Sequence, residues 1–488
     1  MINAPILIIA IPLLSAFLIH LTKYTKLKRA PELVATLALL SSAVALFSTF
    51  KVVLAGETIF YELGGWPAPF GISLAIDALS LFFAFTTLGV GLMIIVYSLG
   101  EYFYARRYYS LLLIALSGIL GIVLTRDLFN LYVFFEILAV ASYVLVTYKH
   151  KARTIVASFK YLIITETAWF FFLLSIALLY VLCGSLNMDS IASQIPLIYQ
   201  NNQQVLMLIF AIMMVCFGIK SGMFPLHTWV PEVHSQAPTA VSSLLSGLIL
   251  KVGLYAMLRT FYLFFGAAFL LEHGIGNILI LFGVVTLIFG ASQALVQNEL
   301  KRLLAYSSIN QIGFILVGIG LGTQGGLTGA LFHIFNHAII KVGLFFCAGI
   351  IISQVGFWEI SRMKGVWHRM PAATLAFCLL SLAVIGIPPF NGFVSKMFII
   401  EAALLAQNYW LLLPLFFGII LTAAYYFRVI QTFFLPQEFK RKEDFVPTPV
   451  GPFEHLSTFF LVSLCLLVGL FPQIILNIIQ PAVRVLLP

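Results

Sequence analysis

Residues 216–240, CFGIKSGMFPLHTWVPEVHSQAPTA, interrupt a long apolar stretch with a lysine, prolines, histidines and a glutamate. The apolar runs on both sides are long enough to cross a bilayer, because a hydrocarbon core of roughly 30 Å needs about 20 apolar residues. Non-helical backbone is tolerated at membrane depth only where it is buried in protein or lines a watery cavity. The interruption around Lys220 therefore predicts a broken transmembrane helix with a functional site at the break.

The composition of the whole chain predicts a membrane protein. Of its 488 residues, 61% are hydrophobic and 9% are charged, whereas about a quarter of the residues in a soluble protein are charged. We expect an all-α integral membrane protein with about fourteen transmembrane helices in a single membrane domain, residues 1–488. The predicted spans are 4–21, 32–54, 74–98, 108–125, 127–148, 157–183, 204–224, 238–264, 275–297, 303–322, 326–353, 371–405, 409–433 and 455–485.

The net charge of +9 does not indicate a nucleic acid partner, because the placement of the basic residues is explained by the membrane topology. Nineteen of the 27 lysines and arginines fall on loops after odd-numbered spans, four on the opposite face and four within spans. The positive-inside rule then predicts a multi-pass protein of the cell (plasma) membrane with both termini outside the cytoplasm. The five cysteines show no CxxC pairing, so neither a disulfide framework nor a metal or cofactor site is indicated.

Four lysines fall inside predicted spans, at Lys220, Lys251, Lys341 and Lys396. A charged side chain at mid-bilayer costs about 2.5–3.5 kcal/mol on insertion scales, so such residues face a bundle interior or water and pair with other groups. A lysine near a helix end can instead extend to the interface, but Lys251 lies near the middle of the eighth span. We expect Lys251 to be a mid-membrane proton carrier.

Acidic residues also fall within or beside the spans. Glu136 lies near the midpoint of the fifth span, where it is either protonated or paired with a cation such as Lys220, because burial disfavours the charged form and an opposite charge favours it. Glu166 is either a second site or a polar contact near a helix end. Asp77 begins the third span, where a helix cap is the favoured role. Three further polar residues are expected near the interface, as solvated loop groups or as a pathway mouth: His227, Glu232 and His234.

The eleventh span carries three titratable residues in LFHIFNHAIIK, His333, His337 and Lys341. Their spacing of four residues places them on one helical stripe, with about 6 Å between successive members. Groups in such a line predict a proton relay, because histidine titrates near neutral pH. The alternatives are inert packing and a metal site, and the stripe lacks the third ligand that a metal site needs.

A second break is predicted in the twelfth span, where SLAVIGIPPFNGFVSKMFII places glycines and prolines before Lys396. The two broken spans are five apart, so pairing spans 4–8 with 9–13 gives two five-helix repeats of opposite orientation. Transporters with inverted repeats bind their substrates at such discontinuous helices. We expect helices 1–3 in residues 1–106, the first repeat in 107–266, the second in 275–433, and a loop with helix 14 in 434–488.

Five motifs follow one another over roughly residues 70–430: DLFNLYVFFEILAVASY, GIKSGMFPLHTWVPEVHSQAPTAVSSLLSGLILKVGLY, NELKRLLAYSSINQIG, LFHIFNHAIIK and GIPPFNGFVSK. Together they resemble the antiporter-like subunits of respiratory complex I and of multisubunit Mrp cation/proton antiporters. The resemblance implies fourteen helices, inverted repeats and a hydrated chain of charged residues across the middle of the membrane. Its members here would be the Glu136–Lys220 pair, the central carrier Lys251, the axis residues His333 and His337, and the terminal group Lys396.

Within this family, Lys396 argues against the M-type subunit of complex I, which usually has a glutamate at that position. The sequence GGWPAPFGI at 64–72 looks most like the Mrp D-type subunit and its relatives in membrane-bound hydrogenases and sulfur-reducing complexes. The implied partners are other membrane subunits and the lipid bilayer. The implied cargo is the proton, with sodium left open.

These residues suggest electrostatic gating as a hypothesis. While Glu136 holds Lys220, Lys251 keeps a proton; when Lys220 moves away, repulsion drives the proton onward to Lys396. Two unit charges about 4 Å apart interact by roughly 4 kcal/mol at an effective dielectric of about 20, which is enough to switch a carrier. The alternatives are a stand-alone transporter of a small solute, a redox enzyme and a purely structural subunit.

Overall fold

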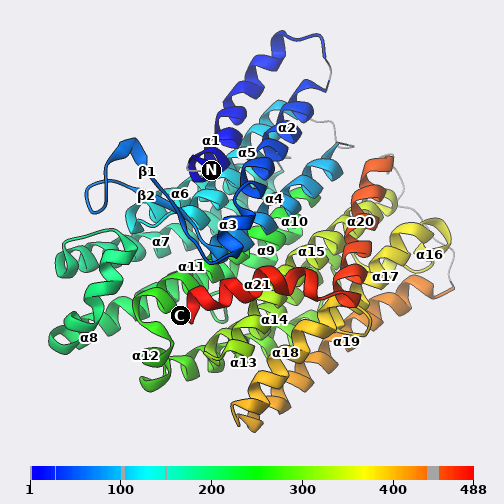
Figure 1. Cartoon of the computed structure of the whole chain (residues 1–488). Helices are drawn as coiled ribbons and strands as arrows, with labels where there is room; N and C mark the ends of the chain where they lie inside the picture. Colours follow the sequence, from blue (N-terminus) through cyan, green and yellow to red (C-terminus); the bar gives the residue numbers. More distant parts are fainter. Residues whose placement is uncertain (1–2, 28, 100–104, 149–150, 437–449, 488) are drawn as a thin grey trace.

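Helices make up almost all of the described chain and lie side by side in a broad bundle, with α1 and α2 at one edge and α18 and α19 at the other (Figure 1). The computed structural model describes residues 3–27, 29–99, 105–148, 151–436 and 450–487. Within these ranges, thirteen helices are long and apolar enough to cross a membrane, and the twelfth predicted span consists of two shorter helices. Five basic residues used for the topology lie outside the described residues: Lys28, Lys149, Lys440, Arg441 and Lys442.

Most of the helices lie within a few residues of the predicted spans. The first third contains α1 (Ala4–Leu18), η1 (Ile19–Tyr24), α2 (Ala30–Phe47), α3 (Phe50–Leu54), β1 (Ile59–Glu62), η2 (Leu63–Gly65), β2 (Ser73–Ile76), α4 (Ala78–Ser98), α5 (Ala105–Leu124) and α6 (Leu128–Val146). The middle contains α7 (Ala152–Cys183), α8 (Met188–Ser221), α9 (Trp229–Gln236), α10 (Thr239–Leu244), η3 (Leu245–Ile249), α11 (Leu250–Phe264), α12 (Gly266–Glu272), α13 (Ile275–Val296) and α14 (Leu300–Gly320). The last third contains α15 (Gln324–Val355), η4 (Ile360–Arg362), α16 (Val366–Arg369), α17 (Pro371–Ile385), α18 (Asn391–Leu405), η5 (Tyr409–Leu411), α19 (Leu412–Phe434), α20 (Pro452–Leu470) and α21 (Gln473–Leu486).

Both predicted helix breaks are present. Helix α8 ends at Gly222, whose φ of 77° is left-handed, and α17 ends at Gly386, whose φ is 93°. Glycine adopts this conformation without the steric cost that a Cβ atom brings. The chain resumes as α9 after the first break and as α18 after the second. The symmetry relation between the two five-helix groups stays a prediction.

Four parts of the fold differ from the predicted spans. Helix α8 begins at Met188, well before the predicted 204, and the predicted span 32–54 is divided into α2 and α3. The chain before α4 forms an antiparallel hairpin of β1 and β2, with Ile59 opposite Ile76, so the third span begins at Ala78 rather than at 74. The predicted helix 455–485 is divided into α20 and α21 at Phe471. A residue before a proline is disfavoured in the helical conformation, and Phe471, which precedes Pro472, has φ −125° and ψ 65°.

Helices α13 and α14 pack backbone against backbone through glycines. Gly276, Gly283 and Gly290 repeat every seven residues along α13. A Cβ atom at Gly290 would lie 2.5 Å from the backbone nitrogen of Asn310, and one at Gly283 would lie 2.9 Å from that of Val317. Small residues allow such close approach between membrane helices. This close-packed seam between α13 and α14 fixes the position of α14. Helix α14 supplies polar partners to the site described below.

We expect Gly290→Ala to destabilise the protein, because the new methyl group meets backbone atoms that cannot rotate away. Overpacking of this kind costs about 1–3 kcal/mol, which would lower the midpoint of thermal unfolding in detergent. The matched control is Gly89→Ala on α4, where a Cβ atom would meet nothing within 4 Å and helix propensity favours alanine by about 1 kcal/mol. Equal stability of the two variants would contradict this account of the seam.

Candidate functional site

The residues predicted to carry protons are almost all buried inside the bundle. The four lysines and two histidines have at most 3% of their surface exposed. They lie on α8 (Lys220), α11 (Lys251), α15 (His333, His337 and Lys341) and α18 (Lys396). Glu136, on α6, is half-buried. The structure therefore places all seven within the bundle, where it divides them into two groups.

The first group joins Glu136, Glu166 and Lys220. Lys220 interacts through its charge with both carboxylates, Glu166 more strongly than Glu136, and the two carboxylates also interact with each other. Glu166 lies in the middle of the long helix α7, and its Oε1 accepts a hydrogen bond of 2.8 Å from the Tyr143 hydroxyl. Because Glu166 is far from either end of α7, it makes no polar contact at a helix end; its role as a second site stays a prediction.

Lys220 lies between aromatic rings rather than in a tight ion pair. Its Nζ atom is 5.6 Å from the ring centroids of both Tyr161 and Trp169. Among the described residues it has no hydrogen-bond partner, and neither does Oε1 of Glu136. A buried ammonium group without fixed bonds can move between neighbours, so this lysine meets the requirement of the predicted gate.

Lys251 is held by an irregular turn at the start of its own helix. The π-helical turn η3 precedes α11, and Nζ of Lys251 donates a hydrogen bond to the carbonyl of Ser246 in that turn. Single π turns inside helices occur frequently at functional sites. The hydroxyl of Ser246 is 2.8 Å from that of Ser308 on α14, which connects this turn to the second half of the chain.

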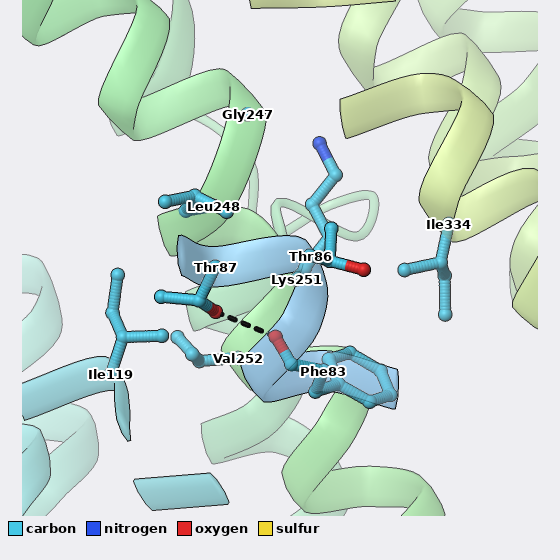
Figure 2. Close-up of a pocket in the computed structure, with 9 residues that line it drawn as sticks. All are labelled: Phe83, Thr86, Thr87, Ile119, Gly247, Leu248, Lys251, Val252 and Ile334. Atoms are coloured by element: carbon cyan, nitrogen blue, oxygen red, sulfur yellow. Dashed lines mark hydrogen bonds between the residues drawn. The ribbon is translucent and has the colours of Figure 1, made fainter. Parts of the chain in front are cut away.

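A small cavity lies beside Lys251, lined by residues of α4, α5, η3, α11 and α15 (Figure 2). Thr86 and Thr87 on α4 and Ile334 on α15 are among its walls. The room for a water-sized sphere is about 10 Å³, close to the smallest volume that holds one water molecule. Thr87 donates its own hydroxyl to the carbonyl of Phe83 at 2.8 Å.

The two groups approach each other where α11 crosses α8. A Cβ atom at Gly253, two residues after Lys251, would lie 2.8 Å from the backbone nitrogen of Ser221, next to Lys220. Only a glycine permits this approach without displacing backbone atoms. The backbone beside the gate lysine thus touches the helix that carries the central lysine.

The second group contains Lys251, His333, His337, Lys341 and Lys396. His337 interacts through charge with Lys251, Lys341 and His333, and His333 interacts in turn with Lys396 and Lys251. The two imidazole rings are nearly parallel, at 8°, with centroids 6.5 Å apart. The stripe predicted from the sequence is therefore present and lies within the electrostatic influence of both Lys251 and Lys396; a relay between them stays a prediction.

His333 has hydrogen-bond partners suited to either protonation state. Its Nε2 lies 3.1 Å from Oε1 of Gln311, and its Nδ1 lies 2.8 Å from the hydroxyl of Ser395. Because a carboxamide oxygen only accepts, Nε2 is the donor in the first bond. The Ser395 hydroxyl can donate to Nδ1, or accept from Nδ1–H while donating to the carbonyl of Gly392 at 3.1 Å.

Lys341 and Lys396 both donate to backbone or hydroxyl oxygens. Lys341 donates to the Leu304 carbonyl at 3.1 Å and to the Ser307 hydroxyl at 2.7 Å. Lys396 donates to the carbonyls of Val384 at 2.8 Å and Ile385 at 2.9 Å, in the last turn of α17. The last carbonyls of a helix have no intrahelical partner and attract cations. Lys396 therefore bridges the second break, whereas Lys220 lies before the first.

Residues 125–422 match the family described as NADH:quinone oxidoreductase/Mrp antiporter, TM. The chain belongs to this family. The N-type subunit of NADH-quinone oxidoreductase from Desulforudis audaxviator (strain MP104C) is 37% identical over 506 residues, covering 100% of this chain and 99% of that protein. The D-type subunit of the Na(+)/H(+) antiporter from Alkalihalophilus pseudofirmus is 36% identical over 422 residues, covering 83% and 82%.

A solved structure with a similar fold is that of the membrane-bound sulfane sulfur reductase, an archaeal respiratory membrane complex. Its matching chain has a TM-score of 0.89 at 30% identity, and the match covers 99% of this chain and 97% of that one. The expected membership among antiporter-like subunits is confirmed. Identity to the N-type and D-type relatives is nearly equal, at 37% and 36%.

Two residues of this member of the oxidoreductase/antiporter family were placed wrongly from its sequence. His227 was expected as a solvated group near the interface, but it is buried, and its ring stacks on that of Phe224. His234 was expected near the interface, but it is fully buried on α9, and its ring stacks on Phe345 at 5.1 Å. His234 interacts through charge with Lys341 and Lys251, which makes it a further member of the second group. Its burial was missed because the segment after the break reads as a polar loop. By contrast, Glu232 is at the surface, where it pairs with Lys160 at 2.9 Å.

Several buried polar atoms along the two groups have no partner among the described residues. Both ring nitrogens of His337 and of His234 lack hydrogen bonds, as do the side-chain amide atoms of Asn391 at the second break. Buried polar groups in proteins are normally hydrogen-bonded to protein or to ordered water. These atoms belong to residues that lie in or beside the second group of this family member.

Proposed function

We propose that the chain moves protons across the cell membrane as one membrane subunit of a multisubunit complex. That complex is either an Mrp-type Na+/H+ antiporter or a redox-driven complex of the NADH:quinone oxidoreductase, hydrogenase or sulfur-reducing kind. The named relatives belong to such assemblies: a subunit of NADH-quinone oxidoreductase, a subunit of a Na(+)/H(+) antiporter and a chain of a respiratory membrane complex. Any redox chemistry is proposed to take place in other subunits.

The observation that carries this proposal is the lack of acidic partners for three buried lysines. Among the described residues, Lys251, Lys341 and Lys396 form no ion pair with a carboxylate. An uncompensated charge in a low-dielectric interior is costly, and the cost is relieved when the group gives up its proton. Lysines in this situation are suited to exchanging protons and unsuited to holding a fixed salt bridge.

The proposed path runs through seven residues as catalytic groups: Glu136, Lys220, Lys251, His333, His337, Lys341 and Lys396. Glu136 and Lys220 form the gate. They are separate from the second group, so a movement of Lys220 changes the electrostatic potential at Lys251. When Lys220 leaves its carboxylates, its charge repels a proton on Lys251 and drives it toward His337. From there the contacts of His333 and Lys341 offer routes toward Lys396 and toward α14.

The partners are proposed to be other membrane subunits, with both termini outside the cytoplasm. The hairpin between β1 and β2 supports contact with a neighbour, because its tip exposes 68% of Trp66 and 90% of Phe70. Large aromatic side chains are enriched at protein interfaces and at the membrane–water boundary. Protons are assigned as the cargo of this chain, since lysines along the path repel sodium ions.

The test is proton movement in vesicles that contain the complete purified complex. We expect a complex in which Lys251, Lys341 and Lys396 are all replaced by methionine to assemble but to carry no protons when driven. Methionine keeps most of the volume and cannot hold a proton. Normal proton movement by that complex would refute the proposal and favour a purely structural subunit. Repeating the wild-type measurement with choline in place of sodium separates proton movement from sodium exchange.

A further inference from the structure

A buried network of charged residues lies outside the proposed path, near the helix ends that the topology places on the outer side. It contains Asp77 before α4, Arg126 between α5 and α6, Asp189 at the start of α8 and Arg259 on α11. The sequence predicted a helix cap for Asp77, and that cap is present: Oδ1 accepts from the backbone nitrogen of Ser80 at 2.9 Å. The two arginines were not predicted as its partners.

Asp77 receives both guanidinium groups at once. Its Oδ2 accepts from Arg126 at 2.6 Å and from Arg259 at 2.6 Å, while Oδ1 accepts from a second nitrogen of Arg259 at 2.8 Å. Asp77 is 2% exposed. Arg126 also donates to Asp189 at 3.1 Å, and the Asp189 side chain is 47% exposed. The network thus extends from the interior of the bundle to solvent.

The network is linked through Arg259 to the helical stripe of α11 that carries Lys251. Lys251, Tyr255 and Arg259 follow one another every four residues on α11, so each lies about 6 Å further along one face. The hydroxyl of Tyr255 donates to the carbonyl of Val123 at 2.5 Å and accepts from Nε of Arg259 at 3.1 Å. Phe83, which lines the cavity beside Lys251 (Figure 2), packs on the ring of Tyr255 at 4.9 Å.

The bonding of this network differs from that of Lys220 and His337 on the proton path. Among the described residues, the side chains of Asp77, Arg126, Tyr255 and Arg259 contribute no buried polar atom without a partner, whereas Lys220 and His337 do. Arginine does not release its proton in proteins. Burial alone would raise the pKa of Asp77, but Arg259 and Arg126 hold that pKa below its usual value, so the carboxylate does not take up a proton. Asp77 and the two arginines therefore do not exchange protons.

We propose that Asp77, Arg126 and Arg259 form a seal that insulates Lys251 from the outer side. A proton on Lys251 then leaves only sideways, toward His337 and the second group. This inference rests on the proposed function, because a seal has a purpose only if Lys251 carries protons. The network would otherwise be a structural clamp among α4, α6, α8 and α11, and the two roles differ in what happens when the network is opened.

The test is the passive leak of protons through the complete complex in vesicles, under an imposed pH gradient and without any driving substrate. We expect Arg259→Gln to raise the leak on the order of tenfold, which corresponds to about 1.4 kcal/mol of barrier. The leak should disappear in the double variant Arg259→Gln with Lys251→Ala, because the open route leads to Lys251. Arg259→Lys should keep the vesicles tight, since it retains the positive charge.

Two further variants serve as a substitute and as a control for Arg259→Gln. Asp77→Asn opens the same network from the other side, and it should leak if Arg259→Gln does not assemble. Arg428→Gln on α19 is the control, because Arg428 bonds to the carbonyl of Gln297, outside both the network and the path, and we expect no leak. An assembled Arg259→Gln complex that stays tight, or a leak that persists without Lys251, would overturn the seal. Normal driven transport by Lys251→Ala alone would instead refute the proposed function.

Discussion

Replacing Lys251 with alanine is expected to reduce driven proton transport to the level of vesicles without the complex. In the proposed path Lys251 lies between the cavity beside α4 and the histidines of α15. Its amine donates to the Ser246 carbonyl of the π turn, and alanine supplies no group that holds a proton there. The measurement is the quenching of a pH-sensitive dye in vesicles that contain the complete complex.

Two companion variants separate proton exchange from charge and from packing. Lys251→Met keeps most of the buried volume, and Lys251→Arg keeps the positive charge but cannot release a proton. We expect both to be as inactive as Lys251→Ala. We expect Lys251→Ala and Lys251→Met to assemble, because they remove a buried charge that has no ionic partner and is costly to bury. Lys251→Arg keeps a charge that this position already holds, and we expect it to assemble as well. Substantial transport by Lys251→Arg would show that a fixed positive charge suffices and would contradict the carrier role.

Replacing Glu136 with alanine is expected to abolish transport by removing the gate. Glu136 has an unbonded carboxylate oxygen, while Glu166 is anchored by Tyr143. We therefore assign the movement of Lys220 to its exchange with Glu136, and Glu166 serves as the fixed partner. Glu136→Gln should be as inactive as Glu136→Ala because it lacks the charge, and Glu136→Asp should retain part of the transport. The same vesicle assay compares the rates.

The control for Glu136 is Glu232→Gln. Glu232 forms its ion pair with Lys160 at the surface, where both side chains are well exposed, and such pairs contribute about 0–1 kcal/mol. Transport by Glu232→Gln should equal that of the unchanged complex. If Glu136→Gln transported as well as Glu232→Gln, the electrostatic gate would be wrong, although Lys251 could still be a carrier.

Features set by neighbouring residues in the chain were predictable from the sequence. The stripe of His333, His337 and Lys341 follows from helical periodicity alone, and the breaks at Gly222 and Gly386 follow from glycine and proline beside a buried lysine. These features depend on a few adjacent positions. Helical periodicity and the conformational preferences of glycine and proline act in the same way in any surrounding fold.

Partners that are distant in the sequence were not predictable. Asp77 bonds to Arg126 and Arg259, which are 49 and 182 residues away. The backbone carbonyls that accept hydrogen bonds from Lys396 could not be recognised in the sequence, because every residue has a backbone carbonyl. The hairpin of β1 and β2 was also missed, since four-residue strands beside glycines and prolines resemble the start of an apolar helix. Such contacts depend on how the helices pack against one another, and that packing cannot be derived from a single sequence.

The position of Lys396 across the second break has a mechanical consequence. Its amine makes two hydrogen bonds, to the carbonyls of Val384 and Ile385, and an amine that has lost its extra proton still retains two N–H groups. Both bonds can therefore persist through a complete cycle of loading and release. In the proposed cycle Lys396 therefore needs no movement of its side chain, in contrast to Lys220, which has no hydrogen-bond partner among the described residues.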